Sequence, residues 1–143
     1  IELCKFRLDL LSPAYLANLN EREPGLSKDS TALLQRANLM MLDDQNISRL
    51  HLEDYFSEHD LPVGQTLEVS NMDLLIEFSK IGLGVGCVIR EFVENELADG
   101  SLVELSLPHS LSKRTAGFVY NKIAAQNDSV KRFIDFYKGE SNK

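Results

Sequence analysis

Residues 66–105 read TLEVSNMDLLIEFSKIGLGVGCVIREFVENELADGSLVEL, and this stretch decides the fold. Its pattern predicts a strand, a helix, a glycine-rich turn, a strand, a second helix and a last strand. Ser70 or Asn71 is expected to cap the first helix, because their side-chain oxygens accept hydrogen bonds from free backbone N–H groups. The apolar residues of that helix recur at helical spacing: Leu74, Leu75, Phe78 and Ile81.

The glycine-rich turn after this helix has two interpretations. Gly82, Gly84 and Gly86 are spaced like part of a dinucleotide-binding motif, but that motif follows a strand and precedes a helix. Here the helix comes first, so we expect the glycines to allow tight packing between helix and strand. Residues 85–89 (VGCVI) are an apolar run, which predicts a strand buried on both faces of a parallel sheet.

The rest of the chain adds further helices and strands to this centre. Helices are predicted from Ser12–Pro13, over 30–36, over about 47–59, and near the carboxyl end on the stripe Val130, Phe133, Ile134 and Tyr137. Their expected caps are Asp29 or Ser30, Asn46 or Ser48, and Asn127 or Asp128. Strands are predicted over residues 3–11, 39–42, 102–107 and 115–120. The sequence therefore predicts an α/β fold.

Four stretches of the sequence resemble the effector-binding domain of LysR-type bacterial transcriptional regulators. They are residues 68–86, 97–103 (LADGSLV), 11–16 (LSPAYL) and 39–43 (LMMLD). One departure is Arg90, because the family usually has proline after the apolar strand. The resemblance implies a type 2 periplasmic-binding-protein-like fold, in which two α/β lobes enclose a cleft.

The resemblance also implies how the chain is divided. Residues 18–105 are expected to form the second lobe, and residues 1–17 and 106–143 the crossover and the carboxyl-terminal part of the first lobe. The sequence begins at Ile1 without a methionine, so we expect a piece of a longer protein. Its early first-lobe elements and its N-terminal winged helix-turn-helix are expected to be absent here.

A ligand site is expected where strands of the sheet enter helices. In open α/β sheets ligands bind beyond the carboxyl ends of strands, and residues 43–48 and 69–72 occupy such places. Helix N-termini there would offer N–H groups to a small anion. Ser48, Ser70 and Asn71 can serve as helix caps, as ligand contacts or as both. The resemblance implies effector contacts from Gln45, Asn46, Ser48, Ser70, Asn71, Met72, Val85 and Gly86.

Composition narrows the class of protein. The chain has 143 residues, of which 43% are hydrophobic, and its formal net charge is −7. Such a charge repels phosphate backbones, so we do not expect this chain itself to hold DNA. It contains no apolar run of membrane length, and we expect a soluble, cytoplasmic protein without a membrane partner. Cys4 and Cys87 are expected to be reduced core residues rather than a disulfide.

The sequence contains few of the residue patterns that enzymes use for catalysis. His51, His59 and His109 lack the spacing of metal ligands, and the cysteines form no C-x-x-C motif. Asp43 and Asp44 are expected to be solvated turn residues, and His59 a packing or helix-end residue. No nucleophile elbow or phosphate-binding loop is present. We therefore predict no catalytic residue, no metal and no cofactor.

These observations lead to one functional hypothesis and two alternatives. The hypothesis is a ligand-sensing regulatory domain that binds a small metabolite or anion between its lobes. The resemblance implies DNA binding through a separate domain and a homodimer or higher oligomer, paired side by side and antiparallel through the effector domains. The alternatives are a solute-binding receptor of a transporter and a pure dimerisation module.

Overall fold

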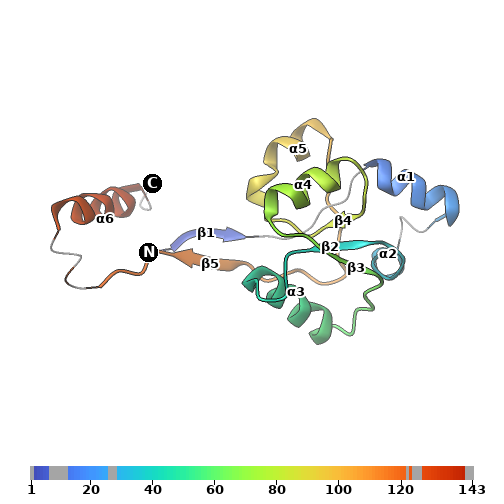
Figure 1. Cartoon of the computed structure of the whole chain (residues 1–143), viewed down its shortest axis with the longest axis horizontal. Coiled ribbons are helices and arrows are strands. Elements are labelled where there is room, and N and C mark those ends of the chain that lie inside the picture. The colour runs from blue at the N-terminus through green and yellow to red at the C-terminus, as the bar shows by residue number, and fades with distance from the viewer. Residues whose placement is uncertain (1, 7–12, 26–28, 122, 124–126, 141–143) are drawn as a thin grey trace. The chain divides into compact units, whose positions relative to one another are not determined.

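The computed structural model describes residues 2–6, 13–25, 29–121, 123 and 127–140 (Figure 1). The chain divides into two compact units. Unit 1 comprises Ile1–Phe6 and Lys113–Lys143, and unit 2 comprises Arg7–Ser112. The predicted α/β class is confirmed, because helices and strands alternate along unit 2.

Unit 2 is built on a parallel sheet of three short strands. The central strand β2 (Leu39–Met41) lies between β3 (Thr66–Glu68) and β4 (Val85–Gly86), and both pairings are parallel. The predicted strand over 85–89 is thus real but shorter. The helices of the unit are α1 (Pro13–Arg22), α2 (Ser30–Arg36), α3 (Ile47–Glu58), α4 (Met72–Lys80) and α5 (Glu94–Asp99), with the 3-10 turn η2 at Arg90–Phe92.

The alternation of side chains along β2 divides the core of unit 2 into two layers. Leu39 and Met41 point to one face, where they pack against residues of α2 and α3. Met40 and Leu42 point to the other face, where they pack under α4 and α5. Figure 1 shows α4 and α5 on one side of the strands and α3 on the other. A strand covered on both faces explains why residues 39–42 are apolar without interruption.

Close packing explains the glycines after α4. A Cβ atom at Gly86 would meet Ser79 Oγ and would lie 2.8 Å from Leu75 Cδ2, and one at Gly84 would meet the backbone oxygen of Asn38. Only a residue without a side chain lets the strand approach α4 and the start of β2 this closely. The prediction of helix-to-strand packing is therefore confirmed for Gly86, whereas Gly84 packs against Asn38 before β2 and Gly82 has a left-handed backbone with φ of 79°.

The described part of unit 1 contains a two-stranded ribbon and one helix. Strand β1 (Glu2–Phe6) pairs antiparallel with β5 (Arg114–Gly117), and α6 spans Asp128–Glu140. The Asn127 side chain caps α6 by accepting a hydrogen bond from the Ser129 N–H at 2.9 Å. Phe118, Phe133 and Tyr137 form an aromatic cluster with ring centroids 5.0–5.4 Å apart.

Two strand predictions differ from the structure. The strand predicted over 102–107 is reduced to a single bridge residue at Val103, because Leu102 is buried under α4 and α5 and its N–H bonds to the Glu96 oxygen. The strand predicted over 115–120 ends at Gly117, where its partner β1 begins at Glu2. Of the strand predicted over 3–11, residues 7–11 lie outside the described part, as does the side chain of Cys4.

Candidate functional site

The carboxyl ends of β2 and β3 form one edge of the parallel sheet. Met41 and Glu68 are register partners at the ends of these strands, and the Val69 N–H bonds to the Met41 oxygen at 2.8 Å. From this edge the chain enters α3 on one side and α4 on the other. The two loops that were predicted to meet a ligand therefore start beside each other. We call this place the carboxyl edge.

Each helix that begins at the carboxyl edge is capped by an asparagine. Asn46 Oδ1 accepts a hydrogen bond from the Ser48 N–H, and Asn71 Oδ1 accepts one from the Leu74 N–H, both at 2.9 Å. These caps confirm the capping predictions for α3 and α4. Each cap uses the amide oxygen, so the Nδ2 groups are still donors at the edge. The helix dipoles add partial positive charge there.

The predicted contact residues differ in how accessible they are. Gln45, Ser70 and Asn71 are exposed, and Asn46, Ser48 and Met72 are half-buried, so six of the predicted residues present surface beside the carboxyl edge. Val85 is only 3% exposed, and Gly86 is buried against Ser79 and Leu75. Effector contact by Val85 and Gly86 stays a prediction, and both residues are buried and give a ligand no open surface.

Arg49 connects α3 with Leu42 and Glu68 at the carboxyl edge, and the sequence analysis did not predict this role. Its Nη1 donates to the Leu42 oxygen at 3.1 Å and lies 3.6 Å from Glu68 Oε2, while its Nε donates to Glu53 Oε1 at 2.8 Å. The side chain is only 15% exposed. The spacing of Arg49 and Glu53, one helical turn apart, was the available signal. The contacts of Arg49 with Leu42 and Glu68 form only in the folded chain, so no local pattern in the sequence predicts them.

The acidic residues of the carboxyl edge either close a local turn or pair with Arg49. Asp43 Oδ1 accepts a hydrogen bond from the Gln45 N–H at 3.2 Å, which closes a local turn, and Asp44 is exposed. Glu53 and Glu68 balance the charge of Arg49. An anion at this edge would therefore be held by backbone N–H groups and polar side chains rather than by a free cation.

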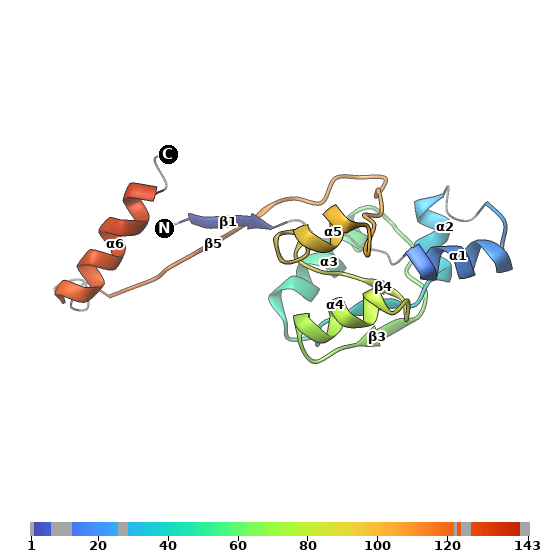
Figure 2. The ribbon, with the colours of Figure 1, turned by 90° about the horizontal axis from the view of Figure 1, so that it is seen from above.

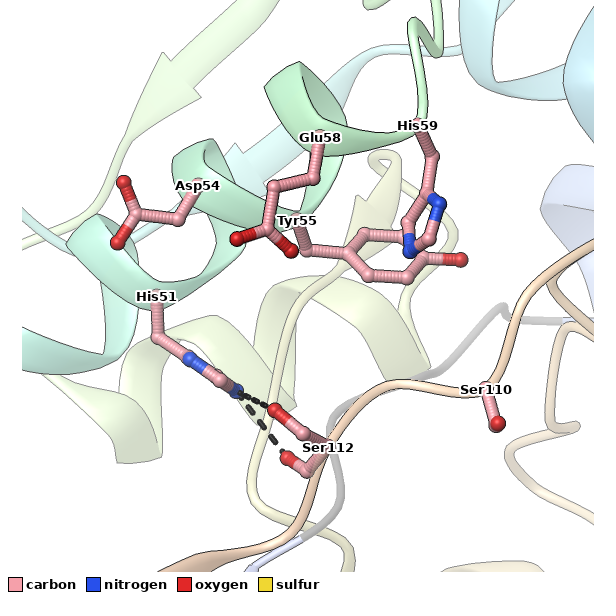
Figure 3. A pocket seen from close by; sticks show the side chains of 7 residues that line it. All are labelled: His51, Asp54, Tyr55, Glu58, His59, Ser110 and Ser112. Atoms are coloured by element: carbon pink, nitrogen blue, oxygen red, sulfur yellow. Dashed lines mark hydrogen bonds between the residues drawn. The ribbon is translucent and has the colours of Figure 1, made fainter.

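A second feature of unit 2 is a cavity of about 270 Å³ between α3 and residues 110–112. Figure 3 shows the His51 ring directed at Ser112, with Nε2 at 3.1 Å from the Ser112 backbone oxygen and 3.4 Å from its Oγ. A carbonyl oxygen only accepts, so the shorter contact favours the tautomer with the hydrogen on Nε2, in which Nε2 takes no proton from the Ser112 hydroxyl. The Asp54 carboxylate points away from His51 (Figure 3). These residues do not form a catalytic triad.

Residues around the same cavity hold residues 109–112 against α3. The Tyr55 hydroxyl donates to the His109 backbone oxygen at 2.6 Å. His59 ends α3 and stacks on the His109 ring with centroids 4.2 Å apart, which confirms its prediction as a helix-end packing residue. Three contacts along one face of α3 therefore fix residues 109–112.

Replacing Tyr55 with phenylalanine is expected to lower the free energy of unfolding by about 1–2 kcal/mol. The ring stays buried, but the His109 oxygen loses its 2.6 Å donor. Thermal unfolding followed by circular dichroism would measure the effect. Tyr120→Phe is the control, because Tyr120 is exposed in unit 1. Equal melting temperatures for the two variants would contradict a stabilising role of this hydrogen bond.

Neither a metal cluster nor a membrane helix is found in the described residues. No three histidine, cysteine, aspartate or glutamate side chains among them are placed to hold a metal ion. Within the same residues no helix is both long enough and apolar enough to cross a membrane. Cys87 is buried in the core layer that contains Leu39 and Met41, as predicted.

Two asparagine-capped helices thus begin at the carboxyl edge of a parallel sheet that is covered on both faces, and this is the edge at which open α/β sheets commonly bind ligands. The family model of the LysR substrate binding domain matches residues 3–142. The chain belongs to this family, and the predicted type 2 periplasmic-binding-protein-like fold is thereby confirmed.

Several solved structures share this fold. The C-terminal domains of a LysR family protein from Agrobacterium tumefaciens C58 align with a TM-score of 0.66 and 23% identity, over 88% of this chain and 58% of that one. The regulatory domain of CrgA from Neisseria meningitidis aligns at 0.65 and 20%, over 98% and 67%. The regulatory domain of CcmR from Synechocystis PCC6803, solved in complex with 2-PG, aligns at 0.65 and 19%, over 95% and 63%.

A curated relative also supports this family assignment. The uncharacterized HTH-type transcriptional regulator YeiE of Escherichia coli K12 is 24% identical over 97 residues, which are 67% of this chain. The chain spans 33% of the length of that relative. YeiE and CrgA are both described as transcriptional regulators.

Proposed function

We propose that this chain is the ligand-sensing part of a bacterial transcriptional regulator of the LysR type. The observation that carries the proposal is the pair of asparagine-capped helices, α3 and α4, that begin at the same edge of the sheet. Such an edge suits a small metabolite or anion. The CcmR regulatory domain with bound 2-PG and the HypT regulatory domain with bound bromide support a small ligand for this class.

We further propose that residues 18–105 are the second lobe, and that residues 1–17 and 106–143 are the crossover and part of the first lobe. Unit 1 supports this division, because it exposes apolar side chains that a complete lobe would cover. They are Phe118, Val119, Tyr120, Ile123, Phe133 and Phe136. An effector would then lie in a cleft between this second lobe and a completed first lobe.

DNA binding and oligomerisation belong to the same proposal. The net charge of −7 favours DNA binding by a separate domain. The residues of β3 are exposed and β3 is the outer strand of its sheet, so it is a surface suited to pairing with a second copy. Exposed Leu67 adds apolar area there. A regulator assembled this way acts in the cytoplasm.

The test is the melting shift that ligands produce in Ser70→Ala and Asn71→Ala. A panel of carboxylates, amino acids, sulfate and phosphate would be screened on the original chain. A ligand at a hundredfold its dissociation constant adds about 2.7 kcal/mol of stability. We expect both variants to lose most of that shift, because they remove polar contacts at the carboxyl edge.

Asn127→Ala is the matched control for the loss of a cap. It removes the cap of α6, just as Asn71→Ala removes that of α4, at about 1 kcal/mol of stability in each case. The control should lower the basal melting temperature and keep the ligand shift. A full shift in both edge variants would exclude the carboxyl edge as the site. Concentration-dependent association without any shift would favour a dimerisation module.

A further inference from the structure

We propose that unit 2 carries a second binding site, for a phosphate group, at the amino ends of its parallel strands. The site is a recess of about 280 Å³ whose polar lining comes from Tyr15, Asn18, Arg22, Arg36 and Asn38, with Gly82 at its edge. The phosphate can be free or part of a small organic molecule. This inference does not depend on the proposed effector function.

The recess lies away from the carboxyl edge. Asn38 directly precedes β2, and Gly82 lies three residues before β4, so both mark the starts of strands rather than their ends. Tyr15, Asn18 and Arg22 come from one face of α1, and Arg36 is the last residue of α2. Figures 1 and 2 both show α1 and α2 together at one end of unit 2.

Charge is the first argument for an anionic ligand. Among the described lysines and arginines of unit 2, Arg49, Lys80 and Arg90 all form ion pairs with carboxylates. Arg22 forms none within the described residues, and Arg36 pairs with Glu23 at 3.6 Å, with 62% of its side chain exposed. Arg22, without an ion pair among the described residues, and Arg36, exposed and paired with Glu23, therefore line one recess of a chain whose net charge is −7.

The hydrogen-bond donors are the second argument. The Asn38 N–H donates to the Tyr15 hydroxyl oxygen at 2.7 Å, which leaves the phenolic hydrogen to donate in turn. The amides of Asn18 and Asn38 and the two guanidinium groups bring further donors from α1 and from the start of β2. Donors from several directions match the tetrahedral oxygens of phosphate better than the planar pair of a carboxylate, and arginine binds phosphate in a bidentate way.

The arginines also have a structural interpretation, which the test must separate from binding. Arg22 and Arg36 lie in the last turns of α1 and α2, where a positive charge stabilises the helix dipole. That role predicts lower stability in the variants and no change in phosphate affinity. Binding predicts weaker phosphate affinity whether or not stability changes.

The experiment is a titration of the isotope-labelled chain with inorganic phosphate and with glycerol phosphate, at constant ionic strength, followed by backbone amide shifts. We expect saturable shifts at Asn18, Asn38 and Gly82. Arg22→Gln and Arg36→Gln should each raise the dissociation constant about tenfold, because each removes a charged donor. Tyr15→Phe, which keeps the ring, should raise it about threefold or more.

Two further variants sharpen the result. Arg90→Gln removes the same charge from unit 2 outside the recess and should leave the dissociation constant within about twofold. Glu23→Gln removes the carboxylate that competes for Arg36 and should strengthen binding. The proposal is overturned if no saturable shift occurs at Gly82, if chloride produces the same shifts, or if Arg90→Gln weakens binding as much as Arg22→Gln. A stronger effect of glycerol phosphate than of free phosphate would identify an organic phosphate as the preferred form.

Discussion

Replacing Gly86 with alanine is expected to lower the free energy of unfolding of unit 2 by about 3 kcal/mol. The added Cβ atom would meet Ser79 Oγ and would lie 2.8 Å from Leu75 Cδ2. Ser79 and Leu75 are both fully buried, so neither can turn toward solvent. Strand β4 would have to move away from α4, and its pairing with β2 would weaken. Urea unfolding followed by circular dichroism measures the loss.

Two further variants make this prediction specific. In Ser79→Ala combined with Gly86→Ala the blocking hydroxyl is absent, so the double variant should be more stable than the sum of the two single effects. Gly139→Ala is the control, because nothing lies within 4 Å of a Cβ atom there. It should be neutral or slightly stabilising, since alanine favours a helix more than glycine does. Strict additivity of Ser79→Ala and Gly86→Ala would contradict the predicted clash.

Replacing Leu75 with alanine should destabilise unit 2 by about 2–5 kcal/mol. Leu75 lies on the buried face of α4 with 0% of its surface exposed, and it packs in the core layer that also contains Met40, Val88 and Leu102. Truncation removes buried methyl groups and leaves a cavity between the helix and the sheet. The melting temperature should fall by roughly 2–4 °C for each kcal/mol lost.

The adjacent residue of the same helix supplies the control. Leu74 is 41% exposed, so Leu74→Ala changes the same side chain at almost the same place and opens no enclosed cavity. We expect a loss below about 1 kcal/mol. Similar melting temperatures for the two variants would show that α4 does not bury the face seen in the structure.

The features that the sequence predicted best are those set by neighbouring residues. Four helix starts were each predicted with two alternative caps, and in each pair one residue accepts hydrogen bonds from backbone N–H groups two or three residues ahead: Asp29, Asn46, Asn71 and Asn127. A cap needs only a short polar side chain beside the first turn of a helix. The starts of the corresponding helices could therefore be predicted from the local pattern.

Strand lengths and contacts across the fold could not be predicted in this way. Residues 102–107 have the composition of a strand, but Leu102 reaches the core by side-chain packing and bonds locally to Glu96. The contact of Arg49 with Leu42 and Glu68, and that of Tyr55 with His109, join residues whose proximity arises only in the folded chain. Of the candidate site, the loops and caps could be predicted and the network that supports them could not.

The pairing of β1 with β5 has a consequence for the order of folding. The two strands of this ribbon are separated in sequence by the whole of unit 2. Closing a flexible loop of about a hundred residues costs on the order of 4 kcal/mol in chain entropy. Two strands of four or five residues gain little to offset that cost while unit 2 is unfolded. The ribbon should therefore form after unit 2 during synthesis, and melting of unit 2 should release it.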